Sequence, residues 1–211
     1  EYLGSNTDEM KLSYLLQTYS LWRVITWTKG YTTLLSIDMN PDDFKTSVSG
    51  GVQDTMLKYI TDMFFQFRGS IDIVVVVHMA PNMSAMIQVE YSPTGFATTL
   101  QNSNFASNRR IQLTNTTIIP IPVPFISNRY WLTHGRDFGN LKIRVINDLT
   151  SNANPLPSAG VAVYIRGAPD FQVAMPYNLP EIGTPPADAE TSKAKYTIKS
   201  AVESRIDKLK K

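Results

Sequence analysis

The chain contains no cysteine and only two histidines among its 211 residues. The absence of cysteine excludes disulfide frameworks, thiolate zinc sites and cysteine nucleophiles, and it suits folding in a reducing cytosol. The longest apolar run, residues 71–77, contains an aspartate and is far shorter than the ~20 residues that span a bilayer. No signal segment precedes it, and a start at Glu1 is expected of a trimmed chain or of a mature product cut from a precursor. We therefore expect no membrane insertion by this chain.

Neither histidine belongs to a recognisable catalytic or metal-binding pattern. His78 ends a valine-rich stretch, where a core or rim position is expected, and His134 lies near Asp137 in a polar loop whose members we expect to satisfy each other. No G-x-S-x-G nucleophile motif is present, and two histidines cannot supply the imidazoles of a metal-dependent jelly-roll enzyme. We expect the acidic pair Asp42–Asp43 to be turn or capping residues. The sequence predicts no enzyme activity, no metal site and no cofactor.

Charge is sparse and unevenly distributed. Charged residues make up 18% of the chain, and the net charge is +2. Residues 191–211 carry seven lysines or arginines against Glu203 and Asp207, so this segment has a charge of +5 and the rest of the chain has −3. Elsewhere, Arg68 and the Arg109–Arg110 pair are isolated along the sequence, without the interleaved aromatic residues of a nucleic-acid platform.

Short stretches of β-branched and aromatic residues, bounded by turn residues, dominate the sequence. Eight of them read as strands: residues 19–28, 32–39, 70–79, 85–91, 110–113, 116–121, 141–149 and 160–165. A further stretch, 171–174, follows a Gly-Ala-Pro-Asp break. Between residues 51 and 69 the apolar residues change to helical spacing, at Met56, Tyr59, Ile60, Met63 and Phe64.

This pattern predicts an all-β fold, because no parallel βαβ alternation appears and long loops separate several strands. We expect an eight-stranded antiparallel jelly-roll sandwich with a short internal helix and an extended C-terminal arm. The expected parts are a lead-in segment over residues 1–18, the jelly-roll domain over 19–176, and a proline-rich linker with a basic arm over 177–211.

The C-terminal arm has a helical pattern of its own. Its apolar residues lie on one side at helical spacing, and lysines occupy much of the rest. The candidate contact residues are Ile198, Val202, Ile206, Leu209 and Lys208. Either this segment is a solvated terminus, or it is an arm that docks on a neighbouring subunit or touches RNA.

Four short motifs occur in a distinctive order. They are residues 63–71 (MFFQFRGSI), 91–95 (YSPTG), 121–127 (IPVPFIS) and 167–171 (GAPDF). Their order resembles that of picorna-like (Picornavirales) virus major capsid proteins. Residues 7–15 (TDEMKLSYL) are similar to the D-E-M segment before the first strand of insect and algal members, which favours the chain that helps surround the three-fold axes. The turn at 92–95 departs from the family's Pro-Pro-Gly, and the lysine-rich tail matches no part of the family pattern.

The resemblance implies a structural rather than a catalytic role for the residues that carry the motifs. These residues are Arg68, Gly69, Ser70, Pro93, Gly95, Pro122, Gly167, Pro169, Asp170 and Phe171. Gly69 and Gly167 would permit bends that a side chain obstructs, and Pro169 would remove a ladder donor where the last strand kinks.

The function implied by the resemblance is that of a structural subunit of a non-enveloped icosahedral RNA virus capsid. Such a subunit would assemble in the host cytoplasm with related jelly-roll subunits into virions, and it would enclose single-stranded RNA. Other capsid proteins are the expected partners, with RNA as a candidate on the inner surface; the host receptor does not follow from the sequence. The alternative is a lectin-like jelly roll in which Trp22, Trp27 or Trp131 stacks on sugar rings, although we favour core positions for these residues.

Overall fold

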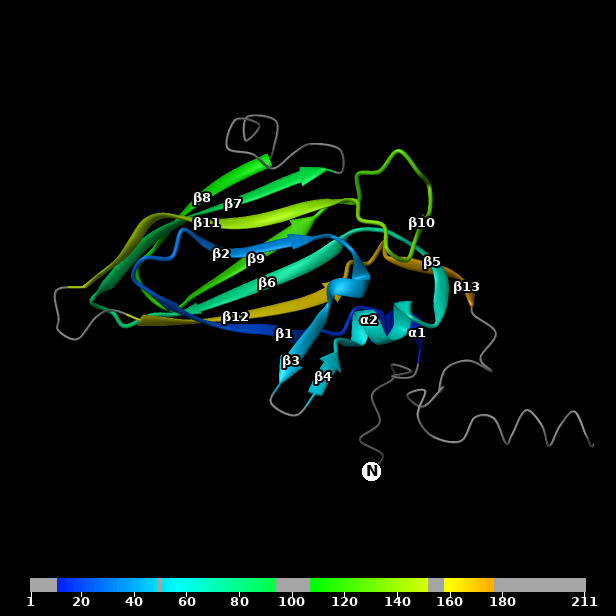
Figure 1. The fold of residues 1–211 in the computed structure, drawn as a ribbon, viewed down its shortest axis with the longest axis horizontal. Coiled ribbons are helices and arrows are strands. Elements are labelled where there is room, and N and C mark those ends of the chain that lie inside the picture. Colours follow the sequence, from blue (N-terminus) through cyan, green and yellow to red (C-terminus); the bar gives the residue numbers. More distant parts are fainter. Residues whose placement is uncertain (1–10, 49–50, 94–106, 152–157, 177–211) are drawn as a thin grey trace, which may run out of the picture. The chain divides into compact units, whose positions relative to one another are not determined.

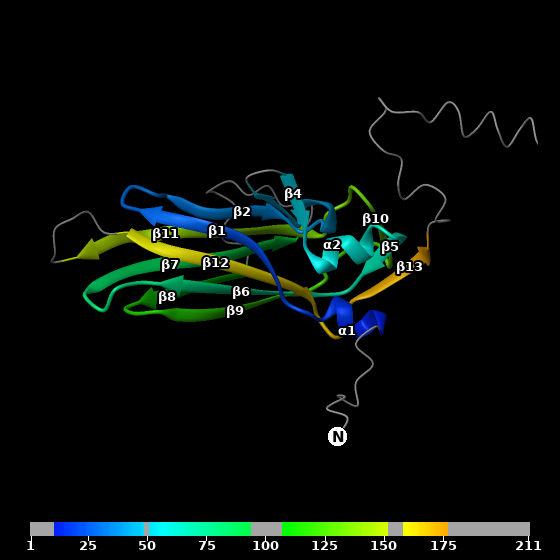
Figure 2. The ribbon, with the colours of Figure 1, turned by 90° about the horizontal axis from the view of Figure 1, so that it is seen from below.

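Two antiparallel four-stranded sheets pack face to face and contain a counterpart of each of the eight predicted strands (Figure 1). The computed structural model describes residues 11–48, 51–93, 107–151 and 158–176. The first sheet has the order β1 (Ser20–Thr28), β12 (Ser158–Gly167), β6 (Ile71–His78), β9 (Thr117–Val123). The second has the order β2 (Thr33–Asp38), β11 (Gly139–Ser151), β7 (Met83–Pro93), β8 (Ser107–Leu113). The edge strands β1 and β2, one from each sheet, lie on one side of the sandwich, and the edge strands β8 and β9 lie on the opposite side (Figure 2).

The core forms because the strands alternate inward apolar residues with more exposed ones. In β6, Ile71, Ile73, Val75 and Val77 are buried, while the residues between them are half-buried. The largest core side chains include Trp22 and Trp27 of β1, both 0% exposed. The expected core position is therefore confirmed for these two tryptophans, whereas Trp131 is half-buried. His78 is exposed at the end of β6, which matches the rim position.

Prolines lie on the outward face of the edge strand β9. Pro120 pairs with Val74 and Pro122 with Asp72, and both prolines are exposed. Proline has no N–H to donate to a further strand, so it is tolerated at a sheet edge and discourages added pairing there.

One end of the sandwich, on the right in Figure 1, carries shorter elements. A three-stranded sheet has the order β10 (Leu132–Thr133), β5 (Phe64–Arg68), β13 (Gln172–Pro176). Helices α1 (Leu12–Leu16) and α2 (Met56–Thr61) and the short 3-10 helix η1 (Pro41–Asp43) lie at the same end, with the hairpin β3 (Lys45–Val48) and β4 (Gly51–Asp54).

The internal helix is shorter than its apolar spacing predicts. Thr55 caps α2 through its Oγ1, which accepts from Lys58 N at 3.3 Å, and the helix ends at Thr61. Met63 and Phe64 continue the helical spacing, yet Phe64 opens strand β5, where it pairs with Pro176 of β13. The prediction of helix for these two residues is wrong because long-range strand pairing overrides a local pattern.

The described structure ends with β13 at Pro176, and residues 177–211 lie outside the described residues. All five candidate arm residues and Gly95 lie outside the described part as well. Within the described ranges, no helix is long and apolar enough to cross a membrane.

Candidate functional site

Three of the four motifs converge at one point, which we call the strand junction: Gly69, Ser70, Phe125, Asp170 and Phe171. Ser70 donates to the Asp170 carboxylate from its backbone N, at 3.1 and 3.2 Å, and from its Oγ, at 2.8 Å. Phe125 N in turn donates to Ser70 Oγ at 3.4 Å. The strand junction therefore joins segments up to 100 residues apart through one serine.

Gly69 is required at the strand junction for two independent reasons. Its φ is +113°, a conformation that side-chain-bearing residues rarely adopt. A Cβ at this position would lie 2.5 Å from both Asp170 O and Phe171 Cα, which are backbone atoms and cannot rotate away. Gly167 is restricted less severely, because its Cβ would meet the Phe171 side chain at 3.0 Å and Leu16 O at 3.2 Å. The predicted need for small residues at both positions agrees with this geometry.

Pro169 has a different role from the one predicted. Strand β12 ends at Gly167, so Pro169 lies outside the ladder rather than at a kink within it. It occupies the second position of a turn that Phe171 N closes by donating to Ala168 O at 2.9 Å. The fixed φ of proline suits this position of a β-turn. The turn redirects the chain into β13, and the Phe171 ring stacks on Phe67 at a centroid distance of 6.2 Å.

Arg68 is isolated along the sequence, but in the fold it has two aromatic neighbours. Its guanidinium lies 4.3 Å from the ring centroid of Tyr130 and 4.9 Å from that of Trp131. Its Nε donates to Gln172 Oε1 at 3.0 Å across the β5–β13 pair. The aromatic residues come from a segment more than 60 positions further along the chain, so no local pattern could reveal the contact.

His134 holds the loop before β11 to η1 and α2. Its Nδ1 lies 2.6 Å from Asp42 Oδ1, and its Nε2 lies 3.0 Å from Thr61 O and 2.5 Å from Phe64 O. All of these partners are acceptors, so protonation of both ring nitrogens satisfies them together. Burial alone would lower the pKa of His134, but its hydrogen bonds to Asp42 and Phe64 raise the pKa above its usual value. The sequence predicted a partner within the same loop and missed Asp42.

Asp42 completes this polar cluster. Burial opposes its charged form, but hydrogen bonds from His134 and Gly135 N lower its pKa below the usual value. Asp42 therefore anchors the loop that contains His134 and Gly135. It is not the cap of η1, because Asn40 Oδ1 accepts from Asp42 N at the start of that helix. Asp62 has a carboxylate oxygen near Asp42 and His134, but it is also bound by Lys58 Nζ at 2.5 Å. The Lys58–Asp62 and His134–Asp42 ion pairs thus account for the clustering of these side chains.

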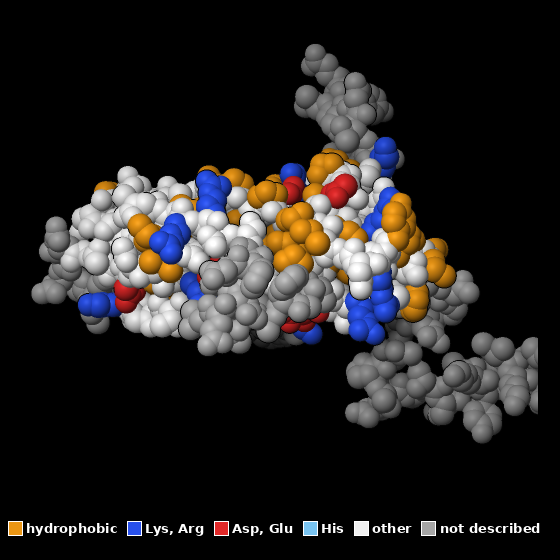
Figure 3. Space-filling view, turned by 90° about the horizontal axis from the view of Figure 1, so that it is seen from above, with side chains coloured by type: hydrophobic (Ala, Val, Ile, Leu, Met, Phe, Trp, Pro, Cys, Tyr) orange, Lys and Arg blue, Asp and Glu red, His pale blue; other side chains and the backbone are white. Residues whose placement is uncertain are grey.

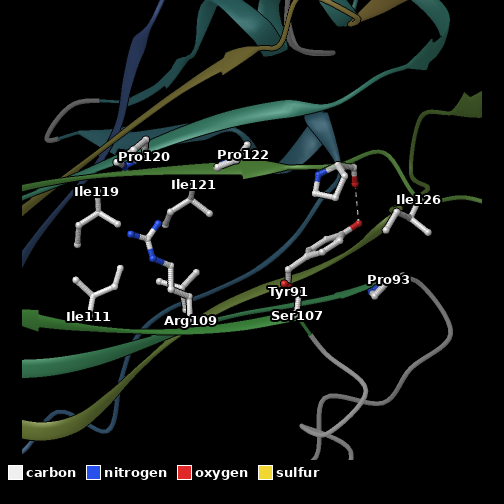
Figure 4. Close-up of a pocket in the computed structure, with 12 residues that line it drawn as sticks. Tyr91, Pro93, Ser107, Arg109, Ile111, Ile119, Pro120, Ile121, Pro122 and Ile126 are labelled. Atoms are coloured by element: carbon white, nitrogen blue, oxygen red, sulfur yellow. Dashed lines mark hydrogen bonds between the residues drawn. The ribbon is translucent and has the colours of Figure 1, made fainter.

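The other motif residues border an apolar groove of about 420 Å³ between the β8 and β9 edges (Figure 4). Pro93 and Pro122 both line it, and Arg109 extends from β8 toward the isoleucines of β9. The Tyr91 hydroxyl lies 3.0 Å from both Pro124 O and Phe138 O at one end. Burial, followed by the charge of Asp137, raises the pKa of Tyr91 to about 12, so the hydroxyl stays protonated and able to donate.

Comparisons with known proteins point to one group of viruses. No protein-family model matches the chain. The chain is similar to the structural polyprotein of Cricket paralysis virus, with 23% identity over 202 residues, which cover 82% of this chain and 23% of the polyprotein. The chain thus spans less than a quarter of the length of the curated relatives it matches.

Solved virus structures share the fold. A chain in the structure of black queen cell virus superposes with a TM-score of 0.72 at 21% identity, covering 82% of this chain and 77% of that chain. A marine algae virus of the order Picornavirales gives a TM-score of 0.66 at 19% identity, covering 81% and 76%. The predicted all-β jelly-roll fold and the predicted resemblance to picorna-like capsid proteins are confirmed.

Proposed function

We propose that this chain is a structural subunit of a non-enveloped icosahedral RNA virus capsid. The observation that carries the proposal is the convergence of three ordered motifs at the strand junction of a complete two-sheet jelly roll. Such a domain presents loops and edges at its periphery, and repetition under closed symmetry turns these surfaces into a shell. Assembly in the host cytoplasm, enclosure of single-stranded RNA and a position near the three-fold axes are parts of the same proposal.

The alternative of a lectin-like module loses its main support. Stacking on sugar rings needs exposed aromatic faces. Trp22 and Trp27 are buried in the core, and Arg68 lies over the ring of Trp131. The comparisons likewise favour the capsid function over the lectin alternative.

The test is to express the full chain together with the other capsid chains of the same virus. Sedimentation and negative-stain imaging should reveal shells or pentameric assemblies that contain this chain. A chain that remains monomeric while the other capsid chains assemble without it would refute the proposal.

A further inference from the structure

An open cleft of about 610 Å³ lies beside the strand junction. Its lining includes Arg68 of β5, Arg129 and Tyr130 of the segment before β10, and Asp170 and Gln172 beyond β12. These residues come from three separate parts of the chain. None of the contacts that build the sandwich core requires the exposed side chains of Arg129 or Tyr130.

Two arginines in this cleft have guanidinium N–H groups without an acceptor among the described residues. Arg68 uses its Nε on Gln172 and its face on two rings, and its terminal nitrogens have no acceptor among the described residues. Arg129 is exposed, and its guanidinium has no partner in the described part of the chain either. The Asp170 carboxylate is already engaged by Ser70. The cleft therefore offers two arginine donors to an external anion, and Arg68 is held in place for it.

Exposed apolar side chains occur in the cleft and elsewhere at the same end of the molecule. Tyr130 is 72% exposed, and Ile126, Phe65 and Met175 are also exposed at this end of the molecule. Basic and hydrophobic side chains lie side by side at the end that carries β5, β10 and β13 (Figure 3). Arginine, tyrosine and tryptophan beside apolar residues are the composition of interaction hot spots between proteins.

We propose that this cleft is a contact site for a neighbouring capsid subunit and that it receives a carboxylate-bearing segment of that subunit. The inference rests on the proposed capsid function and names one surface through which it acts. The carboxylate pairs with Arg68 and Arg129, since the fork of a guanidinium matches a carboxylate in geometry and charge. An adjacent apolar side chain of the partner covers Tyr130.

A protein partner fits the cleft better than RNA does. Surfaces that follow a nucleic-acid backbone are positively charged along a groove, because each nucleotide adds a phosphate. Here only two cations line the cleft, and the carboxylate of Asp170 lies among them. Two arginines beside one carboxylate can balance a single added carboxylate, but they do not match a run of phosphates.

The test begins with Arg129→Glu in the full chain, expressed with the other capsid chains. Arg136→Glu is the matched control, because Arg136 is also exposed, has no side-chain partner in the described part of the chain and does not line the cleft. We expect Arg129→Glu to lower the yield of assembled particles at least about tenfold, with the control within about twofold of wild type. Both variants should keep the wild-type melting temperature. Wild-type assembly of Arg129→Glu would overturn the inference.

A second experiment identifies the occupant. A photo-crosslinking phenylalanine derivative replaces Tyr130 in the full chain, and assembled particles are irradiated. We expect an adduct with another protein chain at a peptide that contains aspartate or glutamate. An RNA adduct, or no adduct in particles that have formed normally, would overturn the inference while leaving the capsid function intact. Failure of the wild-type chain to enter particles that its sister chains form would instead refute the capsid function.

Discussion

The sandwich and the strand junction are stabilised in different ways. In the sandwich, many apolar side chains share one core, and the loss of a single methyl group leaves most contacts in place. At the strand junction, the backbone approach at Gly69 leaves no space for one additional carbon, and the Asp170 carboxylate carries the polar contacts with Ser70. The fold should therefore respond gradually to changes in the sandwich and abruptly to changes at the strand junction.

The sharpest comparison adds one carbon at the strand junction and removes one from the core. Gly69→Ala should destabilise the full chain by about 3 kcal/mol or more, because a positive φ and a 2.5 Å backbone contact oppose the new Cβ. Ile73→Val, at a fully buried site in β6, should cost about 1 kcal/mol. Chemical denaturation of both variants measures the two costs. Equal costs would show that the strand junction is no more sensitive than the core.

Gly167→Val should have an intermediate effect. The added side chain meets the Phe171 side chain at 3.0 Å and Leu16 O at 3.2 Å, which is less close than the 2.5 Å contacts at Gly69. The expected cost is therefore about 1 to 3 kcal/mol, seen as a lower soluble yield and weaker assembly. Ser151→Ala is the control: Ser151 ends strand β11, outside the strand junction, and the substitution adds no atom to the backbone contacts. If both variants fold and assemble equally well, Gly167 has no special role.

The contacts of His134 with Asp42, Thr61 and Phe64 should make the free energy of unfolding depend on pH. The folded protein raises the pKa of His134, so its contribution is complete below the unfolded value of 6.5 and is lost as pH rises through the folded pKa. The lowered pKa of Asp42 means that its contribution is lost only on acidification below 3.8. We expect the melting temperature of the wild type to fall as the pH rises from below 6.5 through the raised folded pKa of His134.

His134→Gln should reduce this fall, and His78→Gln, at an exposed site, should leave it unchanged. Thermal melts of the three proteins across that range make the comparison. The same slope in wild type and His134→Gln would mean that other groups govern the pH response.

The smallest effect on unfolding is expected from deletion of residues 191–211, which follow both regions in the sequence. Because this segment carries a charge of +5 and a one-sided apolar pattern, its role should appear in assembly. Loss of shells at all salt concentrations would indicate docking on a subunit, while normal shells without RNA would indicate phosphate binding, which weakens as salt rises. We expect docking, since RNA binding alone needs no apolar face. Unchanged shells and RNA content would mean that the segment is a solvated terminus.

Sequence patterns predicted the sandwich well. Each of its strands has a local stretch of β-branched or aromatic residues, and alternation such as that of Ile73 and Val75 reports burial directly. The motif residues Gly69, Ser70, Asp170 and Phe171 were also singled out, and the fold brings them together.

The contacts at the end of the molecule escaped sequence reasoning. His134 pairs with Asp42 across 92 positions, and Arg68 meets Tyr130 only after β5 and β10 have paired. Such contacts produce no periodic pattern in the sequence, because they depend on tertiary pairing between short segments. The same reason explains why Phe64 follows a helical spacing and yet forms a strand.

The central claim is that this jelly roll is a capsid subunit. Its most direct test is single-particle electron cryomicroscopy of particles formed by the full chain with the other capsid chains of the same virus. The account predicts a closed shell in which this sandwich occupies one repeated position, with the Arg68–Tyr130 end against a neighbouring subunit. Closed shells that form from the other chains and contain no density for this sandwich would contradict it.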